Sequence, residues 1–226
     1  MAGLELLASD VLLVIDPQVD FCPGGRLAVA DGDAVMPLIN RVASRFEHLI
    51  VTQDWHPAGH SSFASSHPGK QPFETITMPY GPQTLWPDHC VQGSAGAGFH
   101  SALELRHVEL ILRKGFRREI DSYSAFYEND RSTPTGLAGY LRERGLKRIF
   151  LAGLAYDYCV RYSAVDAVRA GFEAVVLEDA CRAIDLGTDG LGTDELAGAN
   201  GESTVAATRR EFAGFGVTQR YAAELA

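Results

Sequence analysis

The sequence has few cysteines and no close pair of them. Four are spread along the 226 residues, namely Cys22, Cys90, Cys159 and Cys181. Structural zinc sites and small disulfide-rich domains both need cysteines at short, repeated spacings, so this distribution excludes both classes. We therefore expect four reduced thiols, and each needs an explanation of its own.

Long apolar runs and basic runs are also missing. No apolar stretch approaches the roughly 20 residues that a helix needs to cross a bilayer. The first ten residues, MAGLELLASD, have neither the basic region nor the apolar core of a signal peptide. The formal net charge of −9 argues against nucleic acid or an anionic membrane as the main partner. We expect a cytoplasmic protein that binds neither nucleic acid nor membranes.

Apolar segments alternate with segments of helical periodicity. The predicted strands cover residues 11–16, 49–52, 108–114, 149–152 and 174–178, and a short last strand lies within 216–221. The predicted helices cover residues 33–46, 134–144, 157–170 and 205–215. This order predicts a doubly wound α/β fold, with a mostly parallel sheet flanked by helices on both faces.

The composition, 46% hydrophobic and 22% charged, is that of a globular protein, and the length predicts a single domain over residues 1–226. Two segments have no clear periodicity. Residues 61–92 are rich in Ser, Pro, Gly and His, and an irregular stretch of that length is usually functional. Residues 185–203, rich in Gly, Asp and Thr, are predicted to form a mobile surface loop.

Four predicted strands lead into reactive side chains. Asp16, Asp54 and Lys114 close three of them, and Cys159 lies in the first turn of the helix that follows the fourth. Taken singly, each has an ordinary interpretation as a cap, a surface lysine or a buried small thiol. However, the carboxyl ends of parallel strands meet at one edge of a sheet, where open α/β folds bind ligands. Their coincidence at that edge predicts a functional site.

The types of these residues favour acyl transfer. At the start of a helix, free backbone N–H groups and the helix dipole favour a thiolate, so Cys159 is the candidate nucleophile. The same N–H groups would hold the oxyanion of an attacked carbonyl. Asp16 would take the thiol proton and return it to a departing amine, while Lys114 would hold Asp16. This set predicts attack on a carbon–nitrogen bond with a thioester intermediate.

A second group of side chains suits a metal ion. Asp54, His56 and His60 fall within seven residues after a predicted strand, and His89 is a candidate to complete the set. A carboxylate and imidazoles are common ligands of divalent transition metals, although a lone histidine in a loop is usually only solvated. Trp86 is a candidate wall for a flat ligand, with an ordinary core aromatic as the alternative.

Six segments of the chain form a recognisable set, namely VIDPQVDFCPGG, QDWHPAGHSSF, LWPDHCVQG, RKGFRREIDSYSAF, LAYDYCV and EDACRAI. Together they resemble one family, the nicotinamidases and pyrazinamidases within the isochorismatase-like cysteine hydrolases. They run from about Val11 to Ile184 in the family's order. The resemblance implies hydrolysis of nicotinamide, and of pyrazinamide, to the acid and ammonia, as a step in NAD salvage, by a homo-oligomer.

The resemblance also implies residue roles. Asp16, Lys114 and Cys159 match a catalytic triad. Asp54, His56 and His89 match the ligands of a divalent metal that binds the pyridine nitrogen. Zinc is the expected metal, with iron or manganese as alternatives, and His60 matches a histidine at or just beyond the ligands.

Further matches concern the substrate pocket. Phe21 and Trp86 match aromatic residues that sandwich the ring. The backbone N–H groups of Ala155 and Cys159 match an oxyanion hole, with a cis peptide bond before Ala155. Tyr156 departs from the small residue usual in the family, and we expect it at the edge of the substrate pocket.

Four alternatives remain open at this stage. One is a related cysteine amidohydrolase with a different amide substrate. Another is a superfamily member that acts on an N-carbamoyl compound or an isochorismate-like ether, and such relatives lack the Asp-His-His set. A third is a non-catalytic protein that senses a pyridine ligand. The last is a metallohydrolase whose metal-bound water performs the reaction, with Cys159 merely structural.

Overall fold

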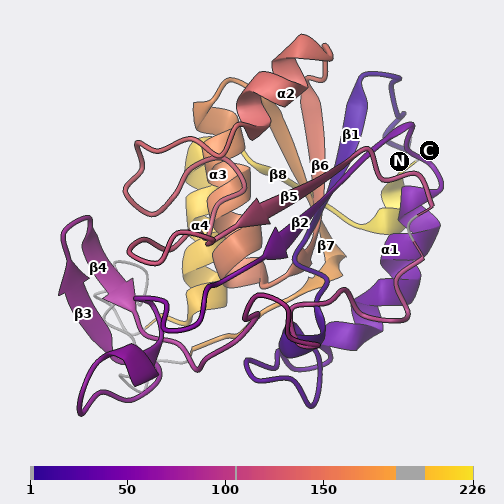
Figure 1. The fold of residues 1–226 in the computed structure, drawn as a ribbon. Coiled ribbons are helices and arrows are strands. Elements are labelled where there is room, and N and C mark those ends of the chain that lie inside the picture. Colours follow the sequence, from indigo (N-terminus) through magenta and orange to yellow (C-terminus); the bar gives the residue numbers. More distant parts are fainter. Residues whose placement is uncertain (1–2, 105, 187–201, 226) are drawn as a thin grey trace.

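Six parallel strands form the central sheet of the computed structural model, which describes residues 3–104, 106–186 and 202–225 (Figure 1). The strands are β1 (Asp10–Ile15), β2 (His48–Asp54), β5 (Leu110–Lys114), β6 (Arg148–Leu154), β7 (Glu173–Arg182) and β8 (Thr218–Arg220). Their spatial order is β5-β2-β1-β6-β7-β8, and all neighbouring pairs are parallel. The chain first winds outward from β1 to β5 and then returns to the other side of β1. The winding direction therefore changes between β1 and β6, where open α/β folds form their ligand crevice.

Helices cover both faces of this sheet. Helix α1 (Met36–Ala43) covers one face, and α2 (Leu137–Glu143), α3 (Arg161–Arg169) and α4 (Thr204–Phe215) cover the other (Figure 1). Successive residues of a strand point to opposite faces. In β1, Leu12 therefore packs in the same core cluster as Ile39 of α1, whereas Leu13 packs in the same cluster as Phe212 of α4. Burial on both faces explains the continuous apolar pattern of β1, and the predicted doubly wound α/β class is confirmed.

The structure differs from the predicted elements in three places. Residues 61–92, predicted to be irregular, contain an antiparallel hairpin of β3 (Thr75–Met78) and β4 (Gly81–Thr84). Both strands are short and only partly buried, so they lack a clean alternation of apolar and polar residues. The helix predicted over residues 33–46 is a 3-10 turn followed by α1, and the one predicted from residue 157 is a π-helical turn followed by α3.

Two predictions, the loop at 185–203 and the single domain over 1–226, extend beyond the described residues. Most of the predicted loop at 185–203, namely 187–201, lies outside the described residues. Within the described part of the chain, no helix has the length and apolar character that a membrane crossing requires. The assignment of residues 1–226 to a single domain stays a prediction.

Candidate active site

The side chain of Lys114 brings the predicted reactive residues together. Its Nζ lies 2.8 Å from Asp16 Oδ2 and 3.3 Å from Cys159 Sγ, and it also donates a hydrogen bond to Asp54 Oδ1. The register of the sheet explains part of this, because Asp54 at the end of β2 is paired directly with Lys114 at the end of β5. These side chains are almost completely buried, with exposed fractions of 0% for Asp16, 1% for Lys114 and 6% for Cys159. The predicted convergence at one edge of the sheet is therefore present.

Burial and charge shift the pKa values of these groups. Burial raises the pKa of the Asp16 carboxyl, and the nearby Lys114 ammonium only partly opposes this. Burial alone would lower the pKa of Lys114, but the carboxylates of Asp16 and Asp54 raise it well above its usual range. Lys114 is therefore a permanent cation that neutralises part of the surrounding negative charge.

Cys159 does not have the lowered pKa that its position in the sequence suggested. Burial raises the pKa of its thiol well above the usual range, Lys114 lowers it less strongly, and Asp16 raises it further. The expectation of a thiolate favoured at this position is therefore wrong, because desolvation and the carboxylates of Asp16 and Asp54 raise the pKa more than Lys114 lowers it. The thiol keeps its proton, and a carboxylate oxygen of Asp16 within 4.8 Å of Sγ is placed to accept it.

Cys159 belongs to the π-helical turn Tyr156–Val160 between β6 and α3. The carbonyl oxygen of Ala155 accepts hydrogen bonds from the N–H groups of Tyr158 and Val160, each at 3.1 Å. The peptide bond between Leu154 and Ala155 is cis, as the resemblance implied. Cys159 therefore lies in a tight turn close to the end of β6 instead of in the first turn of a regular α-helix.

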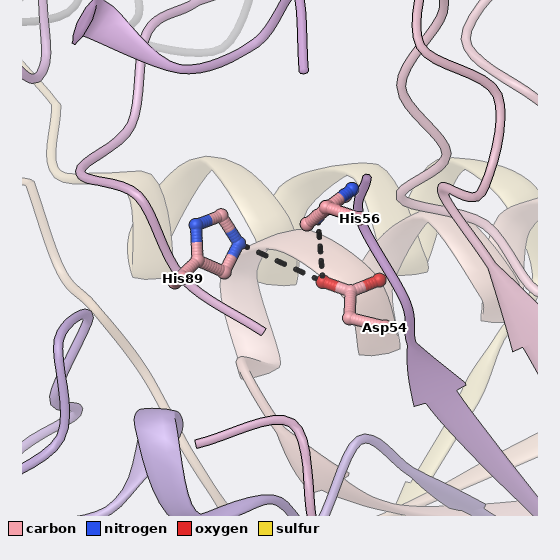
Figure 2. A group of neighbouring side chains, drawn as sticks. All are labelled: Asp54, His56 and His89. Carbon is pink, nitrogen blue, oxygen red and sulfur yellow. Dashed lines mark ion pairs between the residues drawn. The ribbon is translucent and has the colours of Figure 1, made fainter. Parts of the chain in front are cut away.

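The predicted metal ligands Asp54, His56 and His89 form a buried group (Figure 2). Asp54 Oδ2 lies 3.5 Å from His56 Nε2 and 3.8 Å from His89 Nε2. Each histidine donates its Nδ1 hydrogen to a backbone carbonyl at 2.8 Å, His56 to Gly115 and His89 to Pro87. This leaves both Nε2 lone pairs directed toward Asp54, the arrangement in which histidines bind metals. The residues therefore fit a divalent metal ion.

Gly115 makes the position of His56 possible. Its φ of +64° lies in the left-handed region, and a Cβ atom there would collide with the His56 ring. Only glycine combines that backbone conformation with so close an approach. Gly115 directly follows Lys114, so the end of β5 positions both the lysine and a candidate metal ligand.

His60 lies beside this group but belongs to a different cluster, with His56 and Asp121. Its Nδ1 lies 3.2 Å from the N–H of Ser62 and 2.7 Å from the Ser62 hydroxyl, and its Nε2 donates to the carbonyl of Ile120 at 3.2 Å. Both ring nitrogens are thus engaged within the protein. The structure does not bring His60 into the Asp54, His56 and His89 group.

A cavity joins the reactive cysteine to the metal-ligand group. Its lining includes the predicted ring-binding residues Phe21 and Trp86, and also Ala155. Prediction from the sequence missed two further aromatic walls, Tyr123 and Tyr158. Tyr123 accepts a hydrogen bond from Trp86 Nε1 at 3.1 Å, and the Tyr158 ring lies at 87° to Trp86 with a centroid separation of 4.9 Å. In the sequence, Tyr123 lies nearest to Lys114 and Tyr158 is adjacent to Cys159, and this proximity could have indicated that both line the site.

The structure does not bring Tyr156 to this cavity. Its ring packs against Phe212 of α4, and its hydroxyl donates to Gln219 Oε1 at 2.7 Å. It lines a separate cavity together with Cys181 and Arg209. The π-helical turn directs Tyr158, rather than Tyr156, toward the site.

Comparison with known proteins agrees with this geometry. The isochorismatase domain matches residues 10–208. The chain is 57% identical over 175 residues to the nicotinamidase of Acinetobacter baylyi, covering 77% of this chain and 82% of that protein. The chain belongs to the nicotinamidase/pyrazinamidase family. The predicted family is therefore confirmed.

Solved structures of this family share the fold closely. The nicotinamidase/pyrazinamidase of Acinetobacter baumanii is 47% identical, with a TM-score of 0.89 and coverage of 96% of this chain and 98% of that one. PnC1 of L. infantum, solved in complex with nicotinate, is 38% identical, with a TM-score of 0.80 and coverage of 100% and 99%. The pyrazinamidase of Pyrococcus horikoshii, solved in complex with zinc, is 30% identical, with a TM-score of 0.70 and coverage of 94% and 99%.

Proposed function

We propose that this chain is an amidohydrolase that converts nicotinamide and water to nicotinate and ammonia. The observation that carries the proposal is the double role of Asp54. Its Oδ1 accepts a hydrogen bond from Lys114, which also contacts Asp16 and Cys159, while its Oδ2 faces His56 and His89. The Asp54 carboxylate thus links Cys159, the candidate nucleophile, to the candidate metal site that would bind the nicotinamide ring.

The first half of the reaction makes a thioester. Cys159 Sγ attacks the carbonyl carbon of the amide while Asp16 takes the thiol proton. The raised pKa of Asp16 makes its carboxylate a better base, whereas the raised pKa of Cys159 means that the thiol needs such a base to lose its proton. The N–H groups of Ala155 and Cys159 hold the resulting oxyanion, and Lys114 stabilises the negative charge on the cysteine sulfur and on Asp16. When the carbon–nitrogen bond breaks, Asp16 returns the proton to the nitrogen, and ammonia leaves.

The second half releases the acid. Water attacks the carbonyl carbon of the thioester while Asp16 takes one of its protons. The carbon–sulfur bond then breaks, nicotinate leaves, and the proton on Asp16 returns to Cys159. Asp16 therefore acts as base and acid in turn, which requires its carboxylate to stay oriented toward the sulfur.

Substrate binding combines aromatic walls with a metal ion. Asp54, His56 and His89 would hold the metal, which when bound supplies a Lewis acid for the ring nitrogen. Zinc is proposed because these ligand types suit it and because the pyrazinamidase relative was solved with zinc, and iron or manganese are alternatives. Phe21 and Trp86 would sandwich the ring. Pyrazinamide has a ring nitrogen in the same place, so it should also be a substrate.

The test is ammonia release from three amides of similar size. Nicotinamide and pyrazinamide should both be hydrolysed. Benzamide, which lacks the ring nitrogen, should be hydrolysed at least about a hundredfold more slowly because the site's metal would lose its partner. Equal rates on benzamide would contradict the proposed ring anchor, and inactivity on all three would indicate a different amide substrate.

Three further properties stay predictions. A place in NAD salvage and assembly into a homo-oligomer are implied by the resemblance, and a cytoplasmic location is expected from the sequence.

A further inference from the structure

We propose that Thr52 is a positioning residue that orients the carboxylate of Asp16 toward Cys159. The inference rests on the proposed function, in which Asp16 moves the proton. Thr52 lies in β2, two residues before Asp54, and its exposed fraction is 0%.

A single hydroxyl of Thr52 binds Asp16 twice. Thr52 Oγ1 accepts a hydrogen bond from the backbone N–H of Asp16 at 3.0 Å and donates one to Asp16 Oδ1 at 2.5 Å. The backbone N–H needs such a partner because the chain leaves the sheet at this residue. The pairing of β1 with β6 ends at Ile15, and Asp16 has a left-handed φ of +45° that a residue other than glycine rarely adopts.

The contacts of Asp16 Oδ2, the second carboxylate oxygen, show how the hydrogen bond from Thr52 affects the carboxylate. Asp16 Oδ2 lies 2.8 Å from Lys114 Nζ, but the hydrogen bonds of Lys114 are directed at Asp54, Ser122 and Cys159. Among the described residues, nothing donates a hydrogen bond of good geometry to Asp16 Oδ2, although it is buried. Thr52 thus occupies Oδ1 and leaves Oδ2 as the acceptor for the thiol proton.

The location of Thr52 argues that its hydroxyl serves Asp16. Its neighbours Ile50 and Val51 are fully buried apolar residues, and valine has the same shape as threonine. A buried hydroxyl is unfavourable unless it is hydrogen-bonded, and both hydrogen bonds given above go to Asp16. Packing alone would be satisfied by valine.

The experiment compares Thr52→Val with Thr52→Ser, which keeps the hydroxyl. Thr75→Val is the matched control, because the buried Thr75 hydroxyl has no hydrogen-bond partner among the described residues. We expect Thr52→Val to lower kcat for nicotinamide by about tenfold to a hundredfold, with KM changed by less than about threefold. Thr52→Ser should retain kcat within about threefold, and Thr75→Val should match the parent. Metal content and the midpoint of thermal unfolding are measured for every variant.

A second readout does not depend on nicotinamide as the substrate. Alkylation of Cys159 by iodoacetamide, followed by peptide mass spectrometry, also requires loss of the thiol proton. Thr52→Val should slow it at least about fivefold, and Thr52→Ser should not. A parent inactive on nicotinamide would overturn the proposed function, while the alkylation rates would still test Thr52. Unchanged kcat and alkylation in Thr52→Val would overturn the inference, as would equal losses in Thr52→Ser or losses that follow metal content.

Discussion

The two oxygens of the Asp54 carboxylate have different partners, Lys114 on one side and His56 and His89 on the other. Charge matters on both sides, since Lys114 holds the pKa of Asp54 well below its usual range, against the effect of burial. An amide of the same shape would lose the charge and present an N–H group to a cation or to a metal.

The substitution Asp54→Asn is therefore expected to remove both functions. We predict a loss of at least about tenfold in metal affinity and a larger loss of nicotinamidase activity. Metal content after dialysis against a metal buffer is the measurement. Asp31→Asn, which removes an exposed carboxylate at a left-handed position that asparagine tolerates, is the control. Full metal occupancy in Asp54→Asn would contradict the assignment.

Residue identity was more predictable than residue placement. Asp16, Lys114 and Cys159 were predicted from their positions at the ends of apolar runs and from the resemblance, and the structure brings them together. Thr52 was read only as part of a strand, because the alternation of apolar residues does not show which hydroxyl is bonded. The direction of the Cys159 pKa shift depends on burial and on two carboxylates distant in sequence, so local position gave the wrong sign.

At the scale of elements, Asp157 connects three of them. The carboxylate lies in the π-helical turn and accepts hydrogen bonds from the N–H of Ile184 at 3.0 Å, the N–H of Asp185 at 2.8 Å and the Thr204 hydroxyl at 2.6 Å. These bonds join the turn that contains Cys159 to the segment after β7 and to the start of α4. Ile184 also lines the site cavity. The Asp157 carboxylate therefore stabilises both this part of the cavity wall and the turn that contains Cys159.

Removing this support should lower both stability and activity. We predict that Asp157→Ala lowers the free energy of unfolding by about 2–4 kcal/mol, because it leaves the buried Thr204 hydroxyl and two partly buried N–H groups without an acceptor. Thr204→Val, which removes one of the three bonds, should cost about 1 kcal/mol. Urea denaturation of both variants measures this. A cost for Asp157→Ala no greater than that of Thr204→Val would contradict the account.

Regular elements were predicted well and irregular ones poorly, for a physical reason. Buried parallel strands such as β1 and β6 are apolar on both faces, so their sequences are unmistakable. The π-helical turn is only five residues long, so its sequence pattern cannot be told from that of the first turn of an α-helix. Its hydrogen bonds to the Ala155 carbonyl distinguish the two. The turn decides that Tyr158, not Tyr156, faces the site. The β3–β4 hairpin was missed because its strands bury little apolar surface.

At the scale of the whole molecule, all four cysteines are free and buried. Burial raises the pKa of each, to about 11 for Cys22 and about 12 for Cys181. Above a pH of about 9 the unfolded chain loses these protons while the folded chain keeps them, so rising pH favours unfolding.

We therefore predict that the free energy of unfolding falls as pH rises from about 9 to 11, by up to about 1.4 kcal/mol per pH unit for each thiol. Cys22→Ala should reduce this change in the free energy of unfolding per pH unit by the contribution of one thiol. Denaturation at several pH values measures it, under reducing conditions. A slope that is the same in parent and variant would show that Cys22 ionises equally in both states.

The central claim is that Cys159, and not a metal-bound water, attacks the amide. The most direct test is ammonia release from nicotinamide by the parent and by Cys159→Ala, at matched metal content. We predict that the variant keeps its metal and loses more than about a thousandfold in kcat, as expected when a nucleophile is removed. A variant that retains most of its turnover with the same metal content would contradict the account and favour a metallohydrolase in which Cys159 is structural.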